Sequence, residues 1–176
     1  MRQFYTNVPS DLKRGTMLSS LRAMSDDTRN RFISWLGLVG KKNESGWVKL
    51  VVPLINEDWP RERRYRTSAS MMAWIGLLDD TEDSLPSVYE VVKKFLVPVK
   101  TSDHLFYRFT QEVNDEKPIT ALFPETTLDL INKVTPKTLI HPPYELPKIL
   151  ALIAETEPGL TSDPRYLRLI NLVELT

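Results

Sequence analysis

The chain has 176 residues, of which 41% are apolar and 26% are charged, as is ordinary for a globular protein long enough to bury a core. It carries 23 lysines and arginines and 23 aspartates and glutamates, so it lacks the basic excess of a dedicated nucleic-acid-binding domain. It contains no cysteine, which excludes disulfides, thiolate catalysis, zinc–cysteine sites and iron–sulfur clusters.

The sequence also bears on location. The opening stretch MRQFYTNVPSDLKRG has no apolar h-region, so we expect no secretory signal. The uncharged run TSASMMAWIGLL is far too short to span a membrane. We therefore expect a cytoplasmic chain that makes no membrane contact. The sequence does not specify the oligomeric state.

Prolines divide the chain into segments with helical periodicity. There are thirteen prolines and six glycines, and the prolines lie mostly at segment edges, where they start or stop helices. Between them, apolar residues recur at the spacings of one helix face. The expected helices, in chain order, cover residues 10–24, 26–39, 45–57, 60–79, 86–96, 103–112, 124–134, 143–157 and 164–175.

The third of these segments has two interpretations. Its core, WVKLVVPLI, has the β-branched composition of a buried strand. Pro53 would disrupt a central strand, which favours a helix. A proline inside a helix also implies a kink or an early stop at this position.

The fourth segment, from Pro60 to Asp79, begins with four arginines and continues as an almost uncharged helix. Two offset apolar stripes predict that this helix is covered on two sides. The first stripe contains Tyr65, Ala69, Met72 and Ile75, and the second contains Met71, Trp74 and Leu78.

Two segments are similar enough to suggest a repeat. LPSVYEVVKKFLVP (85–98) and FPETTLDLINKVTP (123–136) both open with an apolar residue and proline, and Pro86 and Pro124 lie 38 positions apart. A helical period near 40 residues is typical of HEAT-like α-solenoids. Helices this short need neighbours to bury their apolar faces, and stacked repeats supply them. We predict an all-α fold, either a helical repeat or an irregular helical bundle.

The corresponding domain prediction is a single α-helical domain over residues 1–176. In the repeat interpretation it contains three or four helical hairpins, with boundaries at about 10–58, 59–98, 99–136 and 137–176.

No catalytic or metal-binding motif is present. His104 and His141 are far apart, and neither has a helical partner for a metal pair. The acidic run formed by Asp79, Asp80, Glu82 and Asp83 lacks the spacing and the glycine of an EF-hand loop. Phosphate-binding, dinucleotide-binding and nucleophile-elbow patterns are missing. We expect no enzyme activity, no cofactor and no metal.

The arginine cluster has a structural interpretation. Glu57–Arg61 and Glu62–Arg66 have the i, i+4 spacing of helical ion pairs. Arginines at a helix start oppose the helix dipole, however, so the helix could instead begin after Thr67, with the arginines in the preceding loop. They could also pair with an adjacent repeat.

Two functional interpretations stay open beside it. Arg61, Arg63, Arg64 and Arg66 could bind the carboxylates of a protein partner or the phosphates of a nucleic acid. Arg63 and Arg64 have no acid four residues before them, so we expect these two to contact any partner that binds through charge.

The order of four stretches resembles a known kind of region. They are VVPLINEDWPRERRYRTSASMMAWIGLL (51–78), SLPSVYEVVKKFLVPV (84–99), LFPETTLDLINKVTP (122–136) and YELPKILALIAETEPGLTSDPRYLRLINLVE (144–174). The series resembles, from about Gly15 onward, the C-terminal helical-repeat region of large bacterial multidomain anti-phage defence proteins, of the NTPase type or SIR2-like. The resemblance implies a recognition or scaffolding module and carries over no catalytic residue.

Overall fold

The computed structural model describes residues 10–41, 46–99, 106–111, 117–138 and 141–174. Every regular element in these ranges is helical, which confirms the all-α prediction. The elements are α1 (Ser10–Ala23), α2 (Asp26–Lys41), η2 (Trp47–Val51), η3 (Leu54–Asp58), η4 (Arg63–Tyr65), α3 (Ser68–Asp79), η5 (Glu82–Ser84), α4 (Leu85–Val92), η6 (Tyr107–Thr110), α5 (Ile119–Leu122), α6 (Pro124–Val134), α7 (Leu146–Thr156), η7 (Pro158–Ser162) and α8 (Pro164–Glu174).

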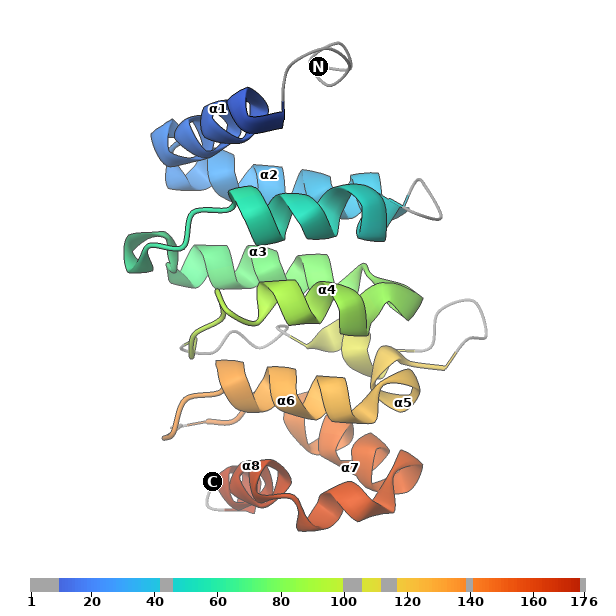
Figure 1. The fold of residues 1–176 in the computed structure, drawn as a ribbon. Helices are drawn as coiled ribbons and strands as arrows, with labels where there is room; N and C mark the ends of the chain where they lie inside the picture. The colour runs from blue at the N-terminus through green and yellow to red at the C-terminus, as the bar shows by residue number, and fades with distance from the viewer. Residues whose placement is uncertain (1–9, 42–45, 100–105, 112–116, 139–140, 175–176) are drawn as a thin grey trace.

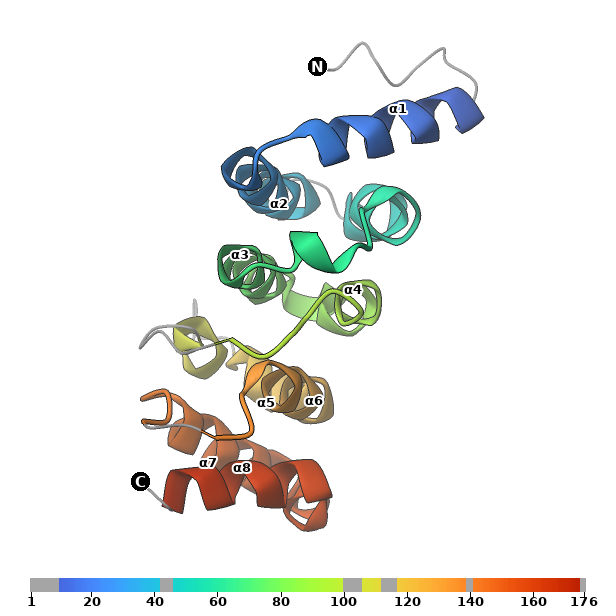
Figure 2. The ribbon, with the colours of Figure 1, turned by 90° about the vertical axis from the view of Figure 1, so that its left-hand side faces the viewer.

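The helices follow one another along the long axis of the molecule in chain order, from α1 at one end to α7 and α8 at the other (Figure 1). After a quarter turn, α2 and α3 lie in one column, and the helix of η2 and η3 lies with α4 and α6 in a second column (Figure 2). Packing follows this order, since α2 packs on α3, α3 on α4, α4 on α6, and α6 on α7 and α8.

Successive helices of the first column run in the same direction. Near the starts of α2 and α3, the hydroxyl of Ser70 donates to Oδ1 of Asn30 at 3.0 Å. Near their ends, Gly37 lies so close to Asp80 that an added Cβ would sit 3.2 Å from its Oδ2. Because start pairs with start and end with end, α2 and α3 are parallel, and the helix of η2 and η3 returns between them.

The bonds between distant helices have a nearly constant sequence separation. Five side-chain to side-chain hydrogen bonds that join distant elements span 36 to 40 positions. They are Asn30–Ser70, Asn56–Lys94, Tyr89–Asp129, Asp129–Arg165 and Asn132–Arg168. This separation is close to the spacing of Pro86 and Pro124. An irregular helical bundle also fits the arrangement, and the four repeat boundaries stay a prediction.

The third segment is helical, so the strand alternative is wrong. The π-helical segments η2 and η3 are joined through Val52 and Pro53, and Pro53 keeps helical angles (φ −60°, ψ −43°). The helix therefore does not stop at Pro53. Bonding to more distant carbonyls, as in a π-helix, is one way in which a chain adapts to a residue without an N–H.

The fourth helix begins later than predicted. Residues 60–66 are not α-helical, and α3 starts at Ser68 with Thr67 as its N-cap, whose hydroxyl accepts from the Ser70 N–H at 3.2 Å. Thus the alternative start after Thr67 is confirmed. The first predicted stripe is wrong in part: Ala69 and Met72 are exposed, because the neighbouring helices cover other faces of α3.

The other segments agree with the sequence to different degrees. The helix predicted for residues 124–134 is observed with the same bounds, as α6. The segment predicted for residues 103–112 is a 3-10 turn, η6, where it is described, and the rest of it, including His104, lies outside the described residues. The short helix α5 and the 3-10 turn η7 have no counterpart among the predictions.

The core runs the length of the stack. At its centre, a series of neighbouring aromatic rings passes from Phe32 through Trp59 and Trp74 to Phe95, with centroids 6.3, 4.8 and 5.6 Å apart in that order. Trp59, Trp74 and Phe95 are almost fully buried. This series ties the first column to the second and fixes the backbone on both sides of the arginine cluster.

In the ranges described, no helix combines the length and the apolar character that crossing a membrane would require.

Candidate functional site

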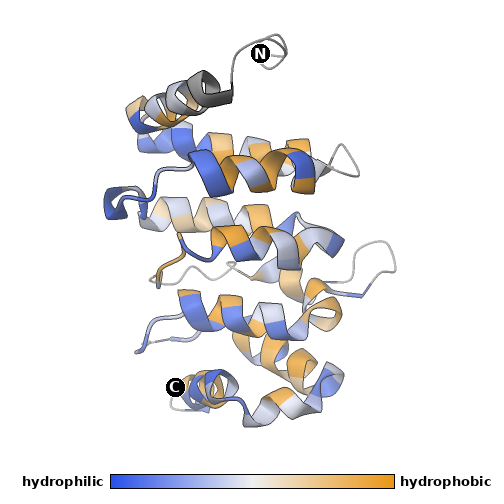
Figure 3. Cartoon of the chain, in the orientation of Figure 1, coloured by the Kyte–Doolittle hydropathy of each residue, from blue (hydrophilic) through white to orange (hydrophobic). Residues whose placement is uncertain are grey.

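The arginine cluster lies in an ordered turn at one edge of the stack, which we call the basic turn (residues 59–67). It connects η3 to α3 and projects at the left of Figure 1. Its residues form a strongly hydrophilic segment beside the largely apolar helix α3 (Figure 3). Trp59 and Pro60 at its start are buried, and Thr67 caps α3 at its end. Both ends of the turn are therefore fixed by the core.

The middle of the turn is held by Tyr65, whose ring is buried and contacts two guanidinium groups. The Cζ atom of Arg29 lies 4.2 Å from the ring centroid, and that of Arg64 lies 4.7 Å from it. Arg29 in turn donates to the carbonyls of Leu21 (3.0 Å) and Met24 (2.6 Å). Cation–π contacts of this kind contribute about 0.5–2 kcal/mol. They anchor the basic turn to the junction of α1 and α2.

The acid inside the turn pairs outside it. A carboxylate oxygen of Glu62 lies 2.6 Å from Nη2 of Arg22 in α1. The pKa of Glu62 is held below its usual value, first by its own backbone N–H and then by the hydrogen bond and charge of Arg22. The predicted Glu62–Arg66 pair does not form, because residues 62–66 are not an α-helix. Arg66 instead donates to the carbonyl of Arg61 at 3.4 Å.

The four arginines have no carboxylate at ion-pair distance within the described part of the chain. Arg61, Arg63 and Arg64 are exposed and Arg66 is half-buried. Arg61 donates to the backbone carbonyl of Asn56 at 2.7 Å. The prediction of local helical neutralisation is therefore wrong, and three guanidinium groups face solvent with their charge uncompensated by a contacting acid.

A further cation lies next to the basic turn. Nζ of Lys94, after the end of α4, donates to Oδ1 of Asn56 at 2.6 Å. Asn56 thus accepts from both Lys94 and Arg61, through its side chain and its backbone. The pKa of Lys94 is lowered, first by desolvation and second by the charge of Arg61. Sequence reasoning missed Lys94, because only the fold brings it to the turn.

Buried polar atoms without a hydrogen-bond partner concentrate in the same turn. Among the described residues they include the hydroxyl of Tyr65, Nε of Arg66 and Oε2 of Glu62. A buried polar group left without a partner costs about 1–3 kcal/mol. The basic turn is therefore stabilised by packing and by its anchors more than by satisfied polar contacts.

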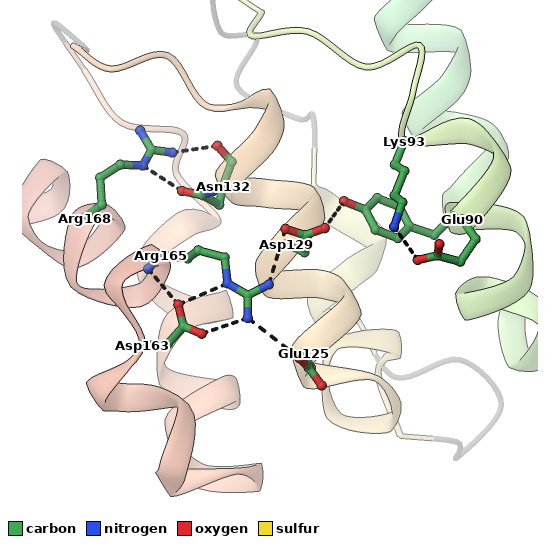
Figure 4. A network of polar contacts seen from close by, with 9 residues as sticks. Glu90, Lys93, Glu125, Asp129, Asn132, Asp163, Arg165 and Arg168 are labelled. Atoms are coloured by element: carbon green, nitrogen blue, oxygen red, sulfur yellow. Dashed lines mark hydrogen bonds and ion pairs between the residues drawn. The ribbon is translucent and has the colours of Figure 1, made fainter.

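The second polar cluster of the molecule is structural. The hydroxyl of Tyr89 in α4 donates to Asp129 in α6 at 2.6 Å, and Arg165 in α8 contacts both Asp129 (3.3 Å) and Asp163 (2.7 Å) (Figure 4). Burial, then the hydrogen bond to Asp129, raises the pKa of Tyr89, so its hydroxyl stays protonated. The hydrogen bond to Asp163 is the main cause of the raised pKa of Arg165. This cluster links α4, α6 and α8.

The acidic run and the two histidines are the remaining candidates for a site. In the part of the chain that the structure describes, no group of three or more histidines, cysteines, aspartates or glutamates could hold a metal ion. The side chain of Glu82, a member of the acidic run, lies outside that part, and His141 is exposed.

A shallow hollow of about 540 Å³ lies where α6 begins beside η7. It is lined by Phe123, Pro124, Glu125, Thr126, Glu157, Gly159 and Leu160. This lining offers two carboxylates but no histidine, lysine or cysteine that would act with them as acid, base or nucleophile.

Comparison with known proteins gives no match: no family model matches the sequence, and no curated protein or solved structure is significantly similar to the chain.

Proposed function

We propose that the chain is a non-enzymatic helical-repeat module that recognises or scaffolds a protein partner in the cytoplasm. The constant separation of 36 to 40 positions between hydrogen-bonded residues of distant helices supports the repeat assignment. Stacked helical hairpins expose long edges and faces, and such surfaces commonly bind other proteins.

The observation that best supports the proposal is the exposed positive charge of the basic turn. Arg61, Arg63 and Arg64 are exposed, contact no carboxylate of a described residue, and lie on a backbone that the buried rings of Trp59 and Tyr65 hold in place. A charged side chain on an anchored backbone loses less conformational freedom when a ligand binds than one on a mobile loop. An arginine turn that served the fold alone would gain stability from internal ion pairs.

From the sequence resemblance alone, we further propose that the module is the C-terminal part of a bacterial multidomain defence protein. The catalytic segments of such proteins have no counterpart in this chain, and the resemblance places recognition or assembly in the helical region.

Nucleic acid is the second candidate partner, and the four arginines favour it. Against it stands the balance of 23 basic and 23 acidic residues, because a nucleic-acid-binding surface is usually basic over a long track. The basic turn offers only a few cations at one point of the edge.

A site-specific photo-crosslinker tests the proposal. Placed at Arg63, it should capture a defined protein in cells that express the chain, and placed at Lys117, an exposed residue away from the turn, it should not. In parallel, anisotropy titrations with DNA and RNA at low salt should show no binding. Nucleic-acid binding with a steep negative dependence on salt would favour the second candidate instead.

A further inference from the structure

We propose that the basic turn is a docking site for an acidic peptide segment of the protein partner, whose carboxylates are bound by Arg63 and Arg64 with Arg61 and Lys94 beside them. This inference rests on the proposed function, since it names the chemistry of the partner's contacting segment.

The first step is the geometry of the donors. Arg63 belongs to the turn η4, where its carbonyl accepts from the Arg66 N–H at 3.0 Å, and its side chain makes no hydrogen bond or ion pair within the described part of the chain. The guanidinium of Arg64 rests on the ring of Tyr65, which fixes its position while its edge stays exposed. Each guanidinium can bind a carboxylate through two parallel N–H donors, which is the strongest contact available to an exposed arginine.

The second step is the repulsion within the cluster. Arg61 and Lys94 both donate to Asn56, and the charge of Arg61 contributes to the lowered pKa of Lys94. Two like charges that share one neighbouring residue repel each other in the free protein. An anionic ligand relieves that repulsion, so its binding gains more than the direct contacts alone would give.

The third step concerns the acid in the turn. Glu62 lies between Arg61 and Arg63 in sequence and would neutralise the cluster if its carboxylate faced the arginines. Arg22 instead holds that carboxylate at 2.6 Å. The ion pair with α1 therefore engages the internal competitor, which stays beyond ion-pair distance of Arg63 and Arg64 although the charge of Arg64 still helps to lower its pKa.

The charge distribution favours a peptide over a nucleic acid. Exposed acids such as Asp83, Glu125 and Glu157 lie outside the basic turn, in η5, at the start of α6 and directly before η7. A nucleic acid needs a basic track along several phosphates, whereas a short acidic segment needs only the few cations of the basic turn. The compact set of three arginines and one lysine matches two to four carboxylates.

The test uses a fluorescein-labelled eight-residue peptide with four glutamates, compared with the same peptide carrying glutamines. Anisotropy at low salt should show binding of the glutamate peptide only. The double variant Arg63→Ala/Arg64→Ala should weaken binding at least about tenfold, as expected for the loss of two charge-assisted contacts. The double variant Lys49→Ala/Lys117→Ala is the matched control, because it removes two exposed cations elsewhere.

Several outcomes would overturn the inference. They are equal binding of the glutamine peptide, equal weakening by the lysine control, and tighter binding of a single-stranded oligonucleotide at the same arginines. Arg63→Glu serves as a second variant, since the side chain of Arg63 is exposed and makes no hydrogen bond or ion pair with a described residue. If crosslinking at Arg63 captures a protein but the acidic peptide does not bind, the proposed function stands and this inference fails.

Discussion

Arg22 in α1 holds the carboxylate of Glu62 in the basic turn at 2.6 Å, across 40 positions of sequence. Both side chains are partly exposed, so the pair adds little to global stability. The pair instead determines where the negative charge of Glu62 lies. With Glu62 turned toward α1, the arginines that follow it face solvent, and the free charge of the basic turn is set by a residue outside it.

The first prediction follows from this pair. In Arg22→Ala the carboxylate of Glu62 should turn back toward the arginines and partly neutralise Arg64. The charge of Arg64 already helps to lower the pKa of Glu62 in the parent protein. Affinity for an acidic peptide should fall about two- to fivefold, which corresponds to a surface ion pair. Peptide titration by anisotropy measures the change, and thermal unfolding should be nearly unaltered.

Removal of both partners is the control for this effect. Arg22→Ala/Glu62→Gln has no competing carboxylate, so its affinity for the peptide should return to at least that of the parent protein. An affinity as low as that of Arg22→Ala would mean that Arg22 itself contacts the peptide, and the competition argument would then fail.

The second prediction concerns Tyr65, whose ring is 8% exposed and whose hydroxyl has no described partner. Tyr65→Phe keeps the ring and removes the unpaired hydroxyl, so stability should be unchanged or slightly higher. Tyr65→Ala should lose about 3–5 kcal/mol, because it removes a buried aromatic side chain. Urea unfolding measures both. Tyr144, which is 85% exposed, supplies the control Tyr144→Ala, with little expected effect.

Local sequence signals predicted the helices well where the signals were strong. The bounds of α6 follow from Pro124 at its first turn and from an apolar stripe that one helix face can bury. The start of α3 was ambiguous, because arginines before Thr67 fit either a helix or a loop. Capping decided it, since the hydroxyl of Thr67 satisfies a free N–H of the first turn.

The site could be predicted only as a list of residues. The charge left free at Arg63 and Arg64 depends on the ion pair between Arg22 and Glu62, and that pair forms only when the fold brings α1 beside the basic turn. The same holds for Lys94 and for the cluster of Tyr89, Asp129 and Arg165. Contacts between residues 36 to 40 positions apart produce no local sequence pattern. In the sequence, each polar residue that makes such a contact looks the same as a polar residue on a solvent-exposed helix face.

The third prediction tests the packing of α2 against η2. A Cβ added at Gly40 would lie 2.3 Å from the ring of Trp47, which is buried. Gly40→Ala should therefore destabilise the protein by about 1–3 kcal/mol through overpacking. Gly76→Ala is the matched control: it lies inside α3 with no atom within 4 Å of the added Cβ, so helix propensity should raise stability by about 0.5–1 kcal/mol. Chemical unfolding of both variants compares them.

The fourth prediction is a pH dependence at Asp163. Hydrogen bonds from the side chain and then the backbone of Arg165 lower the pKa of Asp163 below its usual value. A lowered folded-state pKa stabilises the protein above about pH 4 and loses that effect as the pH falls through the folded value. Asp163→Asn should thus be less stable than the parent at pH 7, with the difference shrinking toward pH 2.

Asp83→Asn, at an exposed carboxylate without a described contact, should show a smaller difference at pH 7. Urea unfolding across this range measures both, and a gap for Asp163→Asn that stays constant down to pH 2 would contradict the assignment.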